Sequence, residues 1–156
     1  MAENPNKISQ IQVGSVTYDI YDAAARTLLP DHEKDDPVYV AIPLNTADVK
    51  PYSEGFIPKI RRWGPIAHLI GAFTLKASQP ANFDITAATL DQKYCPITQV
   101  DQLCQASNEN IWLMQIYSDD PCTLHIARHR LGSNYASAAP GTWFVFNVTY
   151  FITGGY

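Results

Sequence analysis

Hydrophobic and polar residues alternate in short runs along most of this chain, and turn-forming residues separate the runs. The longest run spans residues 142–153, which read Thr-Trp-Phe-Val-Phe-Asn-Val-Thr-Tyr-Phe-Ile-Thr. Aromatic and β-branched side chains of this kind fit a pleated, half-buried surface better than a helix. Pro140-Gly141 marks the start of the run and Gly154-Gly155 marks its end. The pattern predicts a long terminal strand whose apolar side chains need cover from a second sheet or from another subunit.

Shorter runs predict further strands upstream. The clearest of them places Trp112, Met114 and Ile116 on one face, because successive side chains of a strand point to opposite sides. Turn-forming residues bound each of these runs. The predicted strands cover residues 38–44, 56–62, 67–77, 99–105, 111–117 and 123–130.

The run at 67–77 alternates less cleanly than the others. Ile70 and Ala72 fall on its otherwise polar face, which predicts burial on both faces of this strand. Residues 78–98 are rich in turn formers and are predicted to be irregular. Several short strands without a convincing long helix indicate an all-β fold, an antiparallel β-sandwich of the jelly-roll-like kind.

Residues 7–21 predict a separate β-hairpin, with Gly14-Ser15 as its two-residue turn. Two strands alone are marginally stable in water, so the apolar face of this hairpin has to dock on something else. That face is formed by Ile11, Val13, Val16, Tyr18 and Ile20.

A short helix and a linker are predicted after the hairpin. Asp22 is a suitable N-cap for a helix over 22–29, and Pro30 ends it. The charged residues 31–37 are predicted to form a linker. The chain therefore divides into an N-terminal hairpin with a short helix, a linker and a sandwich domain, at 1–30, 31–37 and 38–156.

Composition narrows the class of protein. The 156 residues carry a net charge of −4, which disfavours a nucleic-acid partner. Three cysteines without a Cys-x-x-Cys pair disfavour a zinc site or a disulfide framework and indicate reduced thiols. Neither a secretory signal nor an apolar run of about 20 residues is visible, so we expect no membrane segment. No metal and no cofactor is expected.

Several stretches resemble virion proteins from phages of Gram-positive bacteria. Lys7-Ile-Ser-Gln-Ile-Gln-Val-Gly-Ser-Val-Thr-Tyr-Asp-Ile-Tyr-Asp-Ala-Ala-Ala-Arg26 resembles the N-terminal attachment segment of tail, baseplate and head-fibre proteins. The larger part resembles the C-terminal β-sandwich head of such proteins. Its matching stretches are Pro58-Lys-Ile-Arg-Arg-Trp-Gly64, Leu69-Ile-Gly-Ala-Phe73, Ile111-Trp-Leu-Met-Gln-Ile116 and Gly141-Thr-Trp-Phe-Val-Phe-Asn-Val-Thr-Tyr150.

The resemblance implies a homotrimer that is made in the bacterial host cytoplasm and assembled into the virion. The N-terminal hairpin would attach it to other virion proteins, and the terminal strand would lie partly against neighbouring subunits. This places the trimer interface at Trp143, Phe144, Phe146 and Tyr150. The chain has almost no shaft between hairpin and head, which favours a stubby spike or a decoration over a long fibre.

The densest polar cluster lies in the predicted strand at 123–130. Regular alternation puts His125 and His129 on one face and Arg128 and Arg130 on the other, and the two histidines would lie about 13 Å apart, too far for one metal ion. A solvated strand end, subunit-interface salt bridges and ligand contacts are the alternatives for this cluster. The candidate ligand-binding residues are Trp63, Arg128, His129, Arg130 and Tyr135.

An enzyme is not indicated. The aspartates lie in or near turns, where capping explains them, and no carboxylate pair stands out. Motifs for a nucleophilic serine, a phosphate loop or a dinucleotide site are missing from the sequence. Two functions remain open: a virion spike that adsorbs to host cell-surface saccharide, such as cell-wall polysaccharide, and a purely structural head-fibre, decoration or baseplate component.

Overall fold

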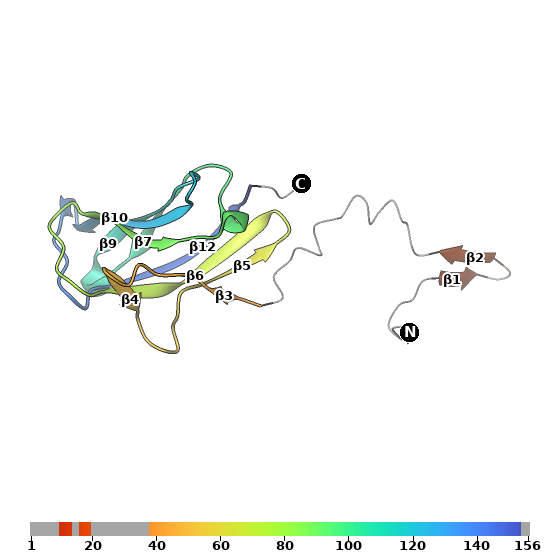
Figure 1. The fold of residues 1–156 in the computed structure, drawn as a ribbon, viewed down its shortest axis with the longest axis horizontal. Coiled ribbons are helices and arrows are strands. Elements are labelled where there is room, and N and C mark those ends of the chain that lie inside the picture. The colour runs from red at the N-terminus through yellow and green to blue at the C-terminus, as the bar shows by residue number, and fades with distance from the viewer. Residues whose placement is uncertain (1–9, 14–15, 20–37, 154–156) are drawn as a thin grey trace.

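A computed structural model of the chain describes residues 10–13, 16–19 and 38–153 (Figure 1). Short turns of 3₁₀ helix, η2 (Gln92–Tyr94) and η3 (Ser107–Glu109), interrupt the strands of the described residues, which are otherwise all-β. The strands are β1 (Gln10–Val13), β2 (Val16–Asp19), β3 (Val40–Ala41), β4 (Val49–Pro51), β5 (Lys59–Trp63), β6 (Ile66–Leu75), β7 (Asp84–Thr89), β8 (Val100–Gln105), β9 (Ile111–Ile116), β10 (Thr123–Leu131), β11 (Asn134–Tyr135) and β12 (Trp143–Phe151).

Strands β3 to β12 form two five-stranded antiparallel sheets. The β10 sheet has the order β11-β10-β9-β8, and β7 also pairs with β10, along residues 123–127. The β6 sheet has the order β12-β6-β5-β3, and β4 pairs with β6. Apolar side chains from both sheets form one core cluster, which runs from Ile42 to Ile152. The predicted antiparallel β-sandwich is therefore confirmed.

The terminal strand β12 shows how this core is filled. Phe144, Phe146 and Tyr150 point inward and are 0%, 3% and 6% exposed, whereas Trp143 on the opposite face is half-buried. The prediction that all four contact a neighbouring subunit is wrong for the three inward residues, because the second sheet of their own chain already covers them. Of the four, Trp143 alone keeps surface that a partner molecule can reach.

The predicted and observed strands differ mainly in the middle of the chain. Residues 84–89 were expected to be irregular, yet they form β7 and pair with β10. Their sequence, Asp-Ile-Thr-Ala-Ala-Thr, has one large apolar side chain, so its alternation is weak. The strand exists because β10 offers it a long partner edge, and only tertiary structure supplies that edge. The strand predicted over 38–44 is shorter than expected, at Val40–Ala41.

The predicted N-terminal hairpin is present as β1 and β2. Val13 pairs with Val16 and Ile11 pairs with Tyr18, which is the register expected for a two-residue turn. The predicted attachment residue Ile20, the helix at 22–29 and the linker at 31–37 lie outside the described residues.

Gly71, in the middle of β6, is expected to be essential for stability. Its φ of 149° is a conformation that side chains disfavour, and an added Cβ would lie 2.5 Å from the Pro58 Cα. The clash is with backbone and cannot be relieved by a side-chain rotation. Gly71→Ala should therefore lower the free energy of unfolding by about 3 kcal/mol, measured by urea denaturation.

The matched control for this substitution is Gly55→Ala. No atom lies within 4 Å of a Cβ added at Gly55, which is exposed. This variant should stay within about 0.5 kcal/mol of the wild type. Equal stability of the two variants would contradict the close approach of Pro58 to β6.

Candidate functional site

The structure does not bring the predicted ligand-binding residues together. Trp63 ends β5 in the β6 sheet, whereas Arg128, His129 and Arg130 lie in β10 and Tyr135 lies in β11, in the other sheet. They therefore form two separate groups, and each group is described by its own contacts.

The ring of Trp63 is already surrounded by neighbouring side chains. The Arg61 guanidinium lies 4.4 Å from the centre of the ring, and the His68 imidazole stacks on it at 6.1 Å. Tyr39 makes an edge contact at 6.0 Å. These contacts fold the indole back onto the sheet and leave it less surface for a ligand than an exposed turn residue has.

His129 is buried, so the prediction that it contacts a ligand is wrong. A β-bulge shifts the register between Ala127 and Arg130, and Arg128 takes a positive φ of 49°. The bulge turns His129 inward, where it is 1% exposed, and removes it from the face that carries His125. A regular strand would have put the two histidines on one face, which is why their predicted alternation fails.

Hydrogen bonds hold the buried His129 ring at both nitrogens. Nδ1 lies 3.1 Å from the Ala136 carbonyl oxygen, and Nε2 lies 3.1 Å from the Asn110 side-chain nitrogen. The carbonyl can only accept and the amide nitrogen can only donate, so Nδ1 carries the proton. His129 thus joins the β10–β11 hairpin to the turn before β9.

Arg130 and Tyr135 clip the two strands of this hairpin together. The Arg130 guanidinium lies 4.5 Å from the centre of the Tyr135 ring and donates a hydrogen bond of 3.0 Å to its hydroxyl. Arg128 is exposed beside them. The hairpin therefore presents Arg128 and the exposed part of Tyr135, whose hydroxyl is already hydrogen-bonded to Arg130.

The outer face of the β10 sheet carries a polar network around His125. Nδ1 of His125 donates to the Asp84 carboxylate at 2.7 Å, and Nε2 lies 3.2 Å from the hydroxyls of both Thr86 and Thr123.

The carboxylates of Asp84 and Asp101 do not form a glycosidase pair. Asp101 lies on β8, three strand spacings or about 14 Å from Asp84 on β7. That separation exceeds the about 5–9.5 Å that paired glycosidase carboxylates need.

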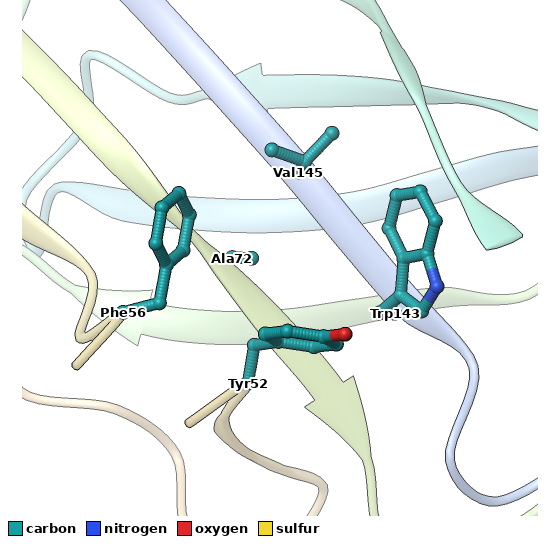
Figure 2. Close-up of a pocket in the computed structure, with 5 residues that line it drawn as sticks. All are labelled: Tyr52, Phe56, Ala72, Trp143 and Val145. Atoms are coloured by element: carbon teal, nitrogen blue, oxygen red, sulfur yellow. The ribbon is translucent and has the colours of Figure 1, made fainter. Parts of the chain in front are cut away.

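A hollow lies on the outer face of the β6 sheet, and we call it the cup. Figure 2 shows Ala72 at its centre, with four larger side chains standing around it. Its volume is about 280 Å³. The residues that line it are Tyr52, Phe56, Ala72, Trp143 and Val145.

Backbone pairing fixes the position of the cup. Ala72 on β6 is the direct partner of Val145 on β12, and the Tyr52 N–H donates to the Ala72 carbonyl at 3.1 Å. The Tyr52 and Trp143 rings meet edge to face, with their centres 6.4 Å apart. Because Ala72 is small, the larger residues rise above it and leave a hollow. The cup is thus formed by the fold before any ligand arrives.

A second hollow of about 300 Å³ continues from the cup and shares Phe56 and Val145 with it. Its lining becomes more polar, since Lys59 and Asn147 contribute to it beside Ile70. We call the two hollows together the outer groove. An aromatic cup that leads to an ammonium and an amide group combines stacking surface with hydrogen-bonding groups, as small-ligand sites do.

Hydrogen bonds orient the polar end of the outer groove. The Tyr39 hydroxyl donates to Nδ1 of His68 at 2.6 Å, and Nε2 of His68 donates to Oδ1 of Asn147 at 2.8 Å. This pattern fixes the tautomer of the ring, because Oδ1 can only accept. The Nδ2 group of Asn147 has no partner among the described residues and remains available as a donor.

The sequence contained one signal for the outer groove. Ala72 and Ile70 were expected to be buried on the second face of their strand, and Ala72 is 3% exposed there. What covers it is the connection that carries Tyr52 and Phe56, together with the outward side of β12. Tyr52 and Phe56 were not predicted as site residues, because no local pattern says that their connection crosses β6.

Burial raises the pKa of the Cys104 thiol from its ordinary value of 9.0 to about 11. The thiol ionises at a lower pH in the unfolded chain than in the folded chain. The stabilisation from burying the neutral thiol is therefore complete below pH 9 and is lost as the pH rises to about 11. Burial raises the pKa of Cys122 and Tyr150 as well, so these groups also stabilise the fold less as the pH rises. We expect urea unfolding to show stability falling above pH 9, with a smaller fall for Cys104→Ala. An unchanged fall in that variant would contradict this origin.

The chain matches no protein-family model and no curated protein. Within the described ranges, no group of three or more His, Cys, Asp or Glu side chains is placed to hold a metal ion. No helix in the described part of the chain is long and apolar enough to cross a membrane. The outer groove is therefore interpreted from its own geometry.

Proposed function

We propose that this chain is a phage virion protein, the head of a trimeric spike that adsorbs to host cell-surface saccharide. The saccharide-binding part of this proposal rests on the geometry of the outer groove. One face of a pyranose ring is apolar and its edge is polar, and the outer groove places Tyr52, Phe56 and Trp143 beside Lys59 and Asn147. The ligand would stack on the rings and bond to the polar groups.

Partial exposure of the aromatic rings supports a role in reversible binding. Tyr52 is 54% exposed and Phe56 is 49% exposed, whereas a ring that served the core alone would be covered. A single saccharide contact of this size is weak. Three heads in a spike and many spikes on a particle would raise the avidity without any new contact.

The virion part of the proposal rests on the resemblance of residues 7–26 to phage attachment segments. Within this segment β1 and β2 form a hairpin, in which Val13 pairs with Val16. Its apolar residues would dock on another virion protein, which would place the sandwich away from the particle surface and toward the host.

A second candidate function is purely structural, as a head-fibre, decoration or baseplate component. The observation that favours it is the same apolar face, because a second subunit or another virion protein could cover Tyr52, Phe56 and Trp143. The two functions differ in whether the face is free in the assembled particle.

Binding of the full-length protein to an array of bacterial cell-wall saccharides tests the proposal. We expect binding to at least one saccharide, and we expect the soluble protein to compete with particles for host cells. If the protein binds none and particles lacking it adsorb normally, the structural alternative holds. Native mass spectrometry of the same sample tests the trimer.

Deletion of residues 7–30 is expected to leave a folded head that no longer joins the particle. Both five-stranded sheets and the core cluster found among the described residues lie within the head, so we expect the head to fold by itself. Circular dichroism and urea denaturation of the shortened protein check its folding, and co-sedimentation with particles checks its attachment. A head that fails to fold after this deletion would contradict the domain boundary.

A further inference from the structure

The cup and the rest of the outer groove call for different chemistry from the ligand. The walls and floor of the cup are aromatic rings, a valine and an alanine, whereas Lys59 and Asn147 lie only in the second hollow. A hydroxyl or an amine placed at the floor would lose its hydrogen bonds to water and gain none, which is unfavourable. The floor therefore suits a small apolar group carried by an otherwise polar ligand.

We infer that the cup receives the methyl group of an acetamido substituent, so that the saccharide is N-acetylated. This inference rests on the proposed saccharide binding and adds the substituent that the site selects. The methyl group would lie on Ala72, with the rings of Tyr52, Phe56 and Trp143 around it. The pyranose ring would extend into the second hollow, toward Lys59 and Asn147.

Polar atoms at the rim complement the amide of such a substituent. Nε1 of Trp143 has no acceptor among the described residues, so it can donate to the acetamido carbonyl. The Tyr52 hydroxyl points toward Trp143 in Figure 2 and can accept from the acetamido N–H. A neutral amide with a methyl group thus satisfies both rim groups while its apolar end fills the cup.

The floor of the cup belongs to the sheet. Floor and one wall are a strand pair, Ala72 with Val145, and the backbone of Tyr52 is hydrogen-bonded to Ala72. A floor that is formed before binding does not have to be ordered for the ligand, so a missing methyl group reduces the affinity directly.

Comparing two matched ligands tests the inference. The full-length protein is titrated with chitotriose and with the same trisaccharide carrying N-formyl in place of N-acetyl groups. We expect the N-formyl ligand to bind about fourfold more weakly, the effect of one buried methyl-sized group. Saturation-transfer NMR should show the strongest transfer from the protein to the acetamido methyl protons.

Filling the cup gives an independent test. Ala72→Leu adds an apolar side chain that projects into the cup, and we expect it to abolish binding of chitotriose. Ala77→Leu makes the same change at an exposed position after β6 and should bind like the wild type. Urea denaturation of both variants separates loss of binding from loss of folding.

Three results would overturn the inference in different ways. Equal affinity for the two trisaccharides, with Ala72→Leu still active, would leave saccharide binding intact and remove the acetamido assignment. Dissociation of the trimer by Ala72→Leu would assign the cup to a subunit interface. Failure of every array saccharide and of both trisaccharides to bind would overturn the proposed function together with the inference.

Discussion

Trp112→Ala is expected to lower the free energy of unfolding by about 4 kcal/mol, more than Gly71→Ala does. Trp112 is fully buried and packs edge to face on Phe144 at 5.4 Å and on Phe146 at 6.5 Å. Its indole N–H donates to the Gln105 carbonyl at 2.9 Å. The substitution therefore leaves a cavity between the sheets and removes the donor from the Gln105 carbonyl, and urea denaturation measures the loss.

Trp112→Phe serves as the control for this effect. Phenylalanine keeps most of the packing on Phe144 and loses the hydrogen bond to Gln105, so a smaller loss than for alanine is expected. If the alanine variant were as stable as the phenylalanine variant, the indole would not fill the centre of the sandwich.

Trp143→Ala is expected to weaken saccharide binding strongly and to change stability little, unlike Trp112→Ala. Trp143 is half-buried and forms one wall of the cup on the outer face of β12. Saccharide affinity should fall about thirtyfold or more, as for other central aromatic contacts, and the free energy of unfolding should change by about 1 kcal/mol or less. Isothermal titration calorimetry and urea denaturation measure the two quantities.

Phe151→Ala is the matched control for Trp143→Ala. Phe151 is 60% exposed and lies on the same strand and face, at the far end of β12 from the cup. Its loss should leave saccharide affinity unchanged. A comparable fall in affinity for both variants would show that the aromatic character of the strand matters more than the cup.

Alternation along strands was the part of the fold that could be predicted from sequence. Trp112, Met114 and Ile116 were placed on one face of a strand, and all three are fully buried. The hairpin register of β1 and β2 also followed from the sequence, because a two-residue turn determines it. Local periodicity and local turn chemistry were enough in these places.

The candidate site could not be predicted in the same way, because nonlocal structure forms it. The cup exists where the connection carrying Tyr52 and Phe56 meets β6 and β12, and no pattern within one strand reveals that crossing. The prediction for His129 is wrong for a related reason, since the bulge at Arg128 changes which way the His129 side chain points. A single inserted residue in a ladder inverts a prediction that rests on alternation.

The most direct test of the outer groove as a saccharide site uses the three tryptophans of the chain as separate reporters. Their indole N–H resonances are recorded in the ¹⁵N-labelled full-length protein, assigned with Trp63→Phe and Trp143→Phe, and followed during titration with chitotriose. We predict that the Trp143 resonance shifts with saturation while the buried Trp112 resonance stays in place. A stationary Trp143 resonance at saturating saccharide, or a shift confined to Trp63, would contradict the assignment of the outer groove as the binding site.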